Sequence, residues 1–120
     1  MSYLQNIRDM YRMIDEGKVF EALEQYYADE VVVVDGMELP RQGKAAQRQA
    51  LQEWFGGIAE MHGGGTTGIT ANEETATTMV ESWTEITMKN GDRIKMEEVG
   101  VQKWQGDKIV HERFYYSIPS

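Results

Sequence analysis

The chain has no cysteine, only two prolines and no long apolar run. The missing cysteines exclude disulfides, thiol nucleophiles and thiolate metal ligands. No segment approaches the about 20 apolar residues of a membrane-spanning helix, and residues 1–10 lack the basic head and apolar core of a signal peptide. Basic residues are also scarce: there are 12 lysines and arginines against 20 aspartates and glutamates. This excess of negative charge would repel the phosphates of a nucleic acid. We therefore expect a cytoplasmic protein that binds neither membrane nor nucleic acid.

What remains is typical of one soluble globular domain. The 120 residues are 41% hydrophobic and 27% charged, which is ordinary for such a domain. A chain of this length buries most of its apolar surface without disulfides or metals. There are no internal repeats and no low-complexity linkers. We therefore predict a single domain over residues 1–120.

The first half of the sequence has helical spacing. A capping box at Ser2 opens the first helix, and Gly17 ends it. A second, short helix carries the apolar residues of segment 19–27, and a third is expected from residue 43 to about 60. Between them, a valine-rich strand is predicted from about 30 to 35.

The second half alternates with the period of strands. Strands are predicted at residues 66–71, 75–88, 93–104 and 108–118. The run Gly63–Gly65 is expected to be a flexible loop, and turns are expected at Gly91 and Gly106. Helices that precede antiparallel strands indicate an α+β domain, with three helices on one face of a curved sheet.

The alternation assigns side chains to two faces of this sheet. Three-residue loops at both turns would keep these faces in register. The predicted inner face holds Val80, Ser82, Thr84, Ile86, Met88, Ile94, Met96, Glu98, Gly100, Gln102, Trp104, Val110, Glu112, Phe114, Tyr116 and Ile118. The outer face alternates charges, as expected beside solvent or a partner, and also carries Trp83, Val99, Val101 and Tyr115. We interpret these four as a covered patch, a homodimer interface through the sheet.

Asp35 is the residue that most directly suggests chemistry. It ends the valine-rich strand, and an acid that is poorly solvated there is a usable general base or acid. The alternative is a turn acid that hydrogen-bonds its own loop through Gly36. Two histidines without cysteine make no metal site, and we expect His62 and His111 at the surface.

Three stretches carry a family resemblance: YADEVVVVDG at 27–36, PRQGKAA at 40–46 and WQGDKIVHERFYY at 104–116. With the order of elements, they resemble the nuclear transport factor 2-like superfamily, and within it the SnoaL-like polyketide cyclases and ketosteroid isomerases. The resemblance spans essentially the whole chain. It implies a cone-shaped α+β fold around an apolar pocket, commonly in a homodimer, and it implies no cofactor.

The resemblance also implies that several catalytic residues of the related enzymes are missing here. Asp35 falls where ketosteroid isomerases carry their catalytic base, but their oxyanion tyrosine falls on Met10, beside Tyr11, and their protonated aspartate falls on Gly100. Losing one such donor costs about 10²–10³ in rate, so steroid isomerisation is not expected. The acid/base aspartate of the cyclases falls on Phe114, and no inward arginine completes the Asp–Arg–Asp set of limonene epoxide hydrolases.

Glu98 and Glu112 could take the place of these missing catalytic groups. Two close inward carboxylates share a proton, so that one acts as an acid and the other as a base. The alternative is that a bulge turns both acids to solvent. We predict binding of an apolar small molecule, with Asp35, Glu98 and Glu112 as catalytic candidates for cofactor-independent proton transfer on a carbonyl compound, of the isomerase, cyclase or hydrolase type. The alternative is a non-catalytic ligand-binding or dimerisation module. The predicted ligand-binding residues are Met10, Tyr11, Val33, Leu51, Phe55, Met96, Gly100, Gln102, Phe114 and Tyr116.

Overall fold

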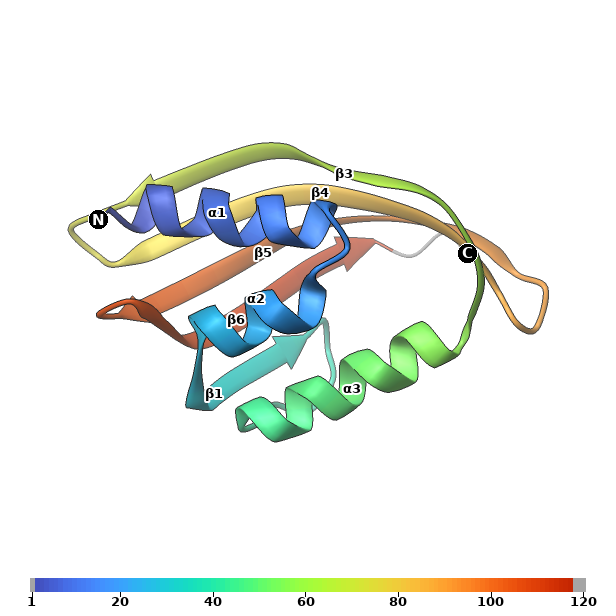
Figure 1. Ribbon diagram of the computed structural model, residues 1–120, viewed down its shortest axis with the longest axis horizontal. Helices are drawn as coiled ribbons and strands as arrows, with labels where there is room; N and C mark the ends of the chain where they lie inside the picture. Colours follow the sequence, from blue (N-terminus) through green and yellow to red (C-terminus); the bar gives the residue numbers. More distant parts are fainter. Residues whose placement is uncertain (1, 118–120) are drawn as a thin grey trace.

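The computed structural model describes residues 2–117, in which three helices lie against one long curved sheet (Figure 1). The helices are α1 (Tyr3–Asp15), α2 (Val19–Tyr26) and α3 (Lys44–Gly56). The strands are β1 (Tyr27–Asp35), β2 (Arg41–Gln42), β3 (Ile58–Asn72), β4 (Thr77–Met88), β5 (Arg93–Gln105) and β6 (Lys108–Ser117). Within residues 2–117, no helix has both the length and the apolar character needed to cross a membrane.

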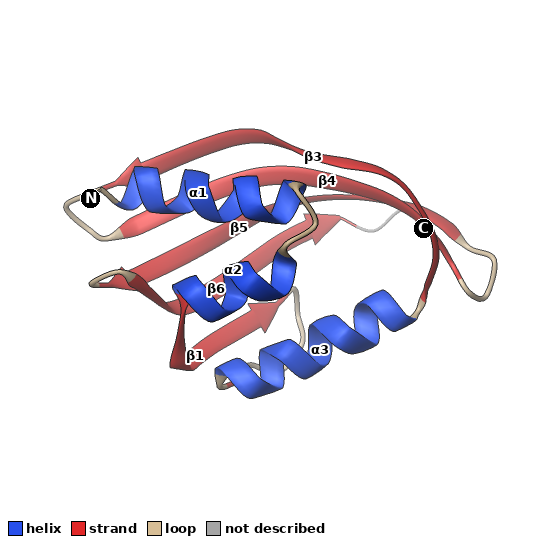
Figure 2. Ribbon diagram, in the orientation of Figure 1, coloured by secondary structure: helices blue, strands red, loops and turns tan. Residues whose placement is uncertain are grey.

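The sheet has the order β2-β1-β6-β5-β4-β3. Strands β1 and β6 pair in parallel, and every other neighbouring pair is antiparallel. All three helices lie on the concave side of this sheet, and its long strands curve round them (Figure 2). The predicted cone-shaped α+β fold is confirmed.

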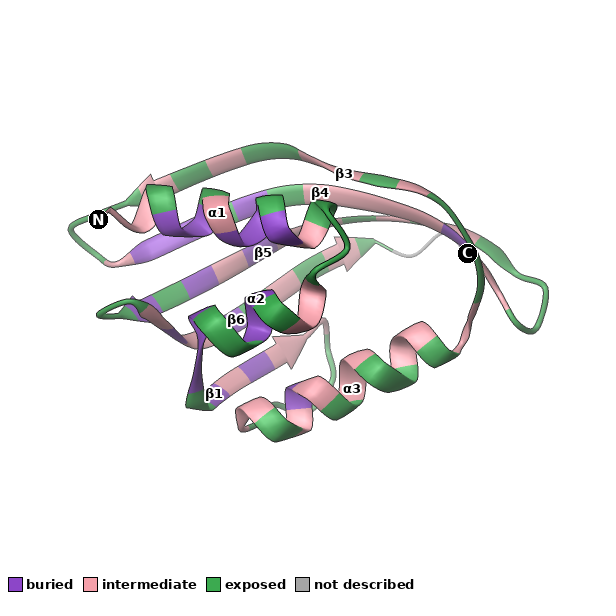
Figure 3. Cartoon of the chain, viewed as in Figure 1, coloured by how far each residue is buried: buried purple, intermediate pink, exposed green. Residues whose placement is uncertain are grey.

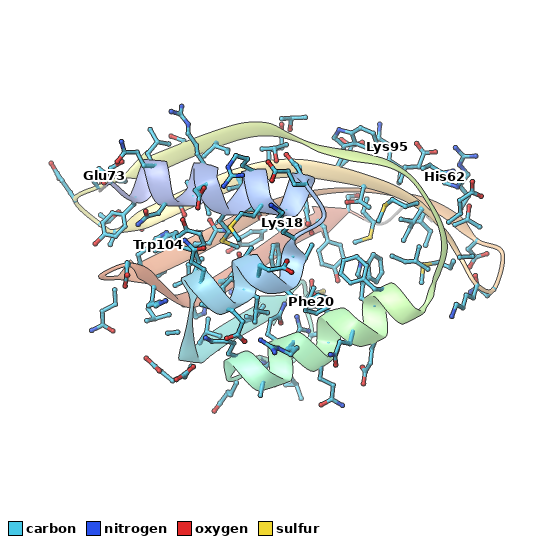
Figure 4. The ribbon with its side chains drawn as sticks, in the orientation of Figure 1. Lys18, Phe20, His62, Glu73, Lys95 and Trp104 are labelled. Carbon is cyan, nitrogen blue, oxygen red and sulfur yellow. The ribbon has the colours of Figure 1, made fainter. Side chains whose placement is uncertain are left out.

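Two distant parts of the sequence fix the start of α1. The predicted capping box is present: the Ser2 hydroxyl accepts from the Gln5 amide at 3.0 Å, and the Gln5 side chain accepts from the Ser2 amide at 3.0 Å. Glu73, in the turn between β3 and β4, accepts the free amides of Tyr3 and Leu4 at 2.9 and 3.2 Å. Figure 4 shows Glu73 at this end of the helix. An anion there also complements the helix dipole.

The packed core lies where α1 and α2 cross the sheet (Figure 3). It contains Ile7, Met10, Tyr11, Met13, Ala22, Leu23, Tyr26, Tyr27, Val31, Val33, Val80, Trp104 and Ile109. The Trp104 ring lies 5.9 Å from both Tyr3 and Tyr26. Helix α3 is different, because Gln47 is its only buried residue and its apolar side chains are half-buried.

The glycine run is part of a strand, so the predicted loop at Gly63–Gly65 is wrong. Helix α3 ends at Gly56 rather than near residue 60, and β3 begins at Ile58. The Trp83 indole lies across these glycines, and a Cβ at Gly63 would stand 3.0 Å from the ring. An aromatic side chain that covers strand glycines restores the burial they lack.

The two hairpin turns differ in length. Met88 pairs with Asp92 across a three-residue loop, as predicted. The second turn holds only two residues, because Gln105 pairs with Lys108, so the three-residue prediction is wrong there. A two-residue loop by itself would exchange the two faces of β6.

A bulge at Val110 restores the faces of β6. Trp104 pairs with Ile109 but Lys103 pairs with His111, so Val110 has no partner in β5. Ile109 is therefore buried in place of Val110, which corrects the predicted face at that position. From Glu112 onward the predicted inner face holds, except that Ile118 lies outside the described residues.

Candidate active site on the inner face of the sheet

The three predicted acids come from neighbouring parts of the inner face. Asp35 ends β1, Glu98 lies in β5, and Glu112 lies in β6. Asp35 pairs in register with Phe114, and Glu98 pairs with Tyr116 two residues further along β6. Glu112 is completely buried and Glu98 is half-buried, so neither is turned to solvent by a bulge.

Glu112 is held at both carboxylate oxygens. The Tyr27 hydroxyl donates to Oε1, and the Gln102 amide Nε2 donates to Oε2 at 2.8 Å. Burial raises the pKa of Glu112 to about 7, because the loss of hydration outweighs these two donors. The nearby charges of Glu98 and Asp35 raise this pKa further.

Gln102 is itself fixed by two further side chains. The Thr78 hydroxyl donates to its Oε1 at 2.8 Å, and Trp104 Nε1 donates to the Thr78 hydroxyl at 2.9 Å. Gly100 leaves the space that Gln102 needs, since a Cβ there would stand 2.9 Å from Nε2 and 3.0 Å from the Phe114 ring. Neighbouring side chains thus fill the position at which ketosteroid isomerases carry an acid.

Asp35 is paired with an arginine that we did not predict on this face. Arg41 Nη2 lies 3.4 Å from Asp35 Oδ2, and Arg41 Nε donates to Gln47 Oε1 at 2.9 Å. Arg41 also contacts Glu38 at 3.4 Å. Strand β2 returns beside β1 and sets Arg41 opposite Val33, on the face that Asp35 shares. The expected lack of an inward arginine is therefore wrong, and the close sequence spacing across Pro40 was its only signal.

Glu98 is the least satisfied of the three acids. Within residues 2–117, its side chain has no hydrogen-bond or ion-pair partner in the structure. Burial, and then the charge of Asp35, raise the pKa of Glu98 to about 7. Tyr116 lies beside the same acids: its ring is packed against Gly36, where a Cβ would stand 2.8 Å from the hydroxyl. Burial, then Asp35, Glu38 and Glu98, raise the Tyr116 pKa.

The predicted ligand-binding residues fall into two groups. Met10, Tyr11 and Val33 belong to the packed core, and Gly100 and Gln102 are fully buried beside Glu112. The half-buried group contains Leu51, Phe55, Met96, Phe114 and Tyr116. Phe55 of α3 faces Phe20 of α2, with ring centroids 6.1 Å apart, and Figure 4 shows Phe20 between these helices.

Two surface hollows lie elsewhere. One, of about 390 Å³, lies between α1 and β3 beside Arg8 and Thr66. The other, of about 450 Å³, lies beside the start of β1 and is lined by Lys44 and Lys108. Neither contains Asp35, Glu98 or Glu112. Within residues 2–117, no three acidic or histidine side chains are arranged to hold a metal ion.

A curved sheet wrapped on three helices, with acids on its inner face, defines an α+β cone of the nuclear transport factor 2-like class. The family model described as the SnoaL-like domain matches residues 2–116. The chain belongs to this family. No curated protein sequence matches the chain.

Solved structures of other proteins have a similar fold. A Mesorhizobium loti protein, provisionally described as a SnoaL-like polyketide cyclase, is 32% identical with a TM-score of 0.87, covering 97% of this chain and 100% of its own. A Burkholderia pseudomallei protein of the nuclear transport factor 2-like type is 16% identical with a TM-score of 0.80, covering 98% and 92%. An epoxide hydrolase/cyclase-like enzyme of pyran ring formation in salinomycin is 21% identical with a TM-score of 0.77, covering 96% and 90%.

Proposed function

We propose that the chain binds an apolar carbonyl compound between α3 and the inner face of the sheet, and moves a proton on it without a cofactor. The observation that carries this proposal is Glu98. It is a half-buried inward acid without a side-chain partner among residues 2–117, and burial raises its pKa to about 7. A carboxyl with a pKa near the working pH exchanges protons efficiently at neutral pH.

The neighbours of Glu98 supply the complementary chemistry. Asp35 is the second candidate base, and the Arg41 guanidinium 3.4 Å from it is a fixed positive charge. Such a charge stabilises an oxygen that becomes negative in the transition state. Tyr116 supplies a hydroxyl donor at the same place. Glu112 is completely buried, so we assign it a supporting role behind these groups rather than contact with the ligand.

The apolar part of the ligand would lie on the half-buried side chains of α3 and the sheet. Helix α3 buries only Gln47, so Leu51 and Phe55 leave apolar surface uncovered. Met96 and Phe114 present similar surface on β5 and β6. Apolar surface with a few converging polar groups is the composition typical of small-molecule sites. The provisional description of the Mesorhizobium loti relative as a polyketide cyclase supports a small-molecule enzyme, although its description also names a carbohydrate phosphatase.

A second candidate function is a non-catalytic binding module of the same fold. The observation that favours it is the Asp35–Arg41 pair, because the guanidinium 3.4 Å away occupies the carboxylate that would otherwise contact a ligand. In that case Asp35 would orient the loop through Glu38, and the inner face would bind a ligand without converting it.

The test is a thermal-shift screen against steroids, aromatic polyketides and terpenoid ketones, followed by proton exchange with the compound that binds. A ligand at about 100 times its Kd adds about 2.7 kcal/mol, which is a shift of several degrees for this chain length. We expect Glu98→Gln and Asp35→Asn each to slow exchange about 10²-fold or more while the ligand still binds. Glu97→Gln is the matched control, because Glu97 is the exposed neighbour of Glu98.

Two results would decide between the candidate functions. Binding without exchange would rule out catalysis and favour the binding module, whereas exchange that both substitutions leave unchanged would rule out Glu98 and Asp35 as the groups that move the proton. If no compound shifts either the wild type or Asp35→Asn, the apolar-ligand proposal fails.

We also propose that a second copy of the chain covers the outer face of the sheet. Met79 and Val101 pair across β4 and β5, and Val99 pairs with Tyr115 of β6, so their apolar side chains adjoin. Met79 is 44% exposed and Tyr115 is 54% exposed, which is unusual for such large side chains. Lys95 and Arg113 lie among acids on this face, so it is complementary to itself in charge.

Sedimentation equilibrium tests this interface. We expect a dimer for the wild type, and Tyr115→Asp should weaken it at least tenfold, because a central tyrosine commonly dominates such an interface. Gln52→Asp, on the exposed side of α3, is the control and should leave the dimer intact. A monomeric wild type at high micromolar concentration would refute the proposal.

A further inference from the structure

We infer that Trp104, Thr78 and Gln102 are positioning residues, which form a one-way chain of hydrogen bonds that fixes a donor on Glu112. The chain decides whether this buried carboxyl holds a proton. Its consequence for Glu98, the acid that the ligand would meet, rests on the proposed function. The three residues lie on β4 and β5, where Thr78 pairs with Gln102 and Gln102 pairs with Glu112 of β6.

The direction of the chain follows from the chemistry of its first member. The Trp104 indole N–H can only donate, so the Thr78 hydroxyl must accept from it at 2.9 Å. The single Thr78 hydrogen is then free to donate to Gln102 Oε1 at 2.8 Å. With its oxygen occupied, the Gln102 amide must turn its Nε2 to Glu112, at 2.8 Å. The amide orientation is therefore specified by groups two residues away along the chain of bonds.

Burial leaves these groups no other partners. Thr78 and Gln102 are 0% exposed and Trp104 is 5% exposed, so bulk water does not replace a broken bond. Gly100 adds to this constraint, because it lets the Gln102 amide lie close to the β5 backbone. A flip of the amide would place its carbonyl oxygen against the Glu112 carboxylate.

The hydrogen-bonded chain has a large effect on Glu112 because, within residues 2–117, no cation is paired with this carboxylate. The groups that face Glu112 are Tyr27 and Asp35 of β1, Tyr11 of α1 and Glu98 of β5. None of them is positive, and the nearby Arg41 is paired with Asp35. Among the described residues, the neutral donors Tyr27 and Gln102 are what stabilises the charged form against burial.

The proton on Glu112 also matters to Glu98. The charges of the two acids interact, so an ionised Glu112 makes ionisation of Glu98 harder, and the two titrate together. The hydrogen-bonded chain holds a donor on Glu112. It would therefore help to determine the pH range over which Glu98 exchanges its proton. The three residues act through Glu112 and touch no ligand.

The experiment is an NMR titration of the glutamate carboxyl carbons in the intact protein, from pH 5 to 9. We expect Gln102→Leu to raise the Glu112 midpoint by about one unit or more, because one donor to the carboxylate is lost. Thr78→Val should raise it less, and Trp104→Phe least, since each acts one bond further away. Thr78→Ser keeps the hydroxyl and should restore the wild-type midpoint. Thr70→Val, on exposed β3, is the control.

An unchanged Glu112 midpoint in a folded Gln102→Leu protein would overturn the inference. If that variant does not fold, an unchanged midpoint in Thr78→Val has the same meaning. Shifts that are equal in all variants, Thr70→Val included, would also overturn it, because they would report general loosening. The titration needs no ligand, so a shifted midpoint in a protein that binds no compound would uphold the chain and refute only the proposed function.

Discussion

Raising the pH from 5 to 8 should lower the free energy of unfolding by about 3 kcal/mol or more. Glu98 and Glu112 are responsible, because burial raises the pKa of each to about 7, from the ordinary value of 4.5. Over this range one such group contributes about 2–3 kcal/mol, and the two are coupled. Most globular proteins show no such decline between these pH values.

The sign follows from which state holds the protons. Below pH 4.5 both acids are protonated in the folded and the unfolded chain, so their full contribution to stability is present. Between about 4.5 and 7, the unfolded chain loses these protons while the folded chain keeps them, and stability falls as pH rises. The lowered pKa values of Asp9 and Glu16 act below this range and do not offset the decline.

Urea unfolding at pH 5, 6, 7 and 8 measures this dependence directly. Glu98→Gln and Glu112→Gln should each flatten the curve, and the double variant should remove most of it. Glu97→Gln, which changes an exposed acid on the outer face, should leave the curve as it is. A wild-type stability that stays constant or rises from pH 5 to 8 would contradict the burial of these two acids.

Restoring an acid at Gly100 should damage the fold rather than create an isomerase. Gly100→Asp should lower the free energy of unfolding by about 3–5 kcal/mol, a value typical of an uncompensated buried charge. Its Cβ would stand 2.9 Å from Gln102 Nε2 and 3.0 Å from the Phe114 ring. The new carboxylate would also join Glu98 and Glu112 on the inner face, where the charges of the acids repel one another.

Gly100→Ala adds the Cβ without the charge. We expect it to lower the free energy of unfolding by about 1–3 kcal/mol, which is the steric part of the effect. Gly68→Asp and Gly68→Ala are matched controls, because Gly68 is also a strand glycine but has nothing within 4 Å of its Cβ position. Urea unfolding at pH 7 compares the four variants. Equal losses at Gly100 and Gly68 would show that the packing of Gln102 against Gly100 is not what requires a glycine there.

The fold could be predicted because its signals are local. The capping box at Ser2, the valines before Asp35 and the alternation in β4 and β5 each follow from neighbouring residues. The inner face was predicted correctly at Glu98 for the same reason, and at Glu112 because the bulge at Val110 offsets the shorter turn. The glycine run was misassigned because its partner, the Trp83 indole, comes from another strand.

The missing parts of the site depend on long-range contacts. Arg41 reaches Asp35 only because β2 folds back beside β1, and a two-residue strand has too little pattern to predict. The bonds from Trp104 through Thr78 to Gln102 join two strands in a specific register. The raised pKa values of Glu98 and Glu112 also depend on burial, and burial is a property of the whole fold.

The short turn after Gln105 and the bulge at Val110 have a consequence for how this chain can vary. Each alone shifts β6 by one residue, and together they cancel. Deleting Val110 would carry Glu112 to the outer face, and so would adding one residue to the turn, whereas both changes together would preserve the site. Insertions and deletions in this hairpin are therefore tolerated only in compensating pairs, and homologues that differ in turn length should differ in the bulge as well.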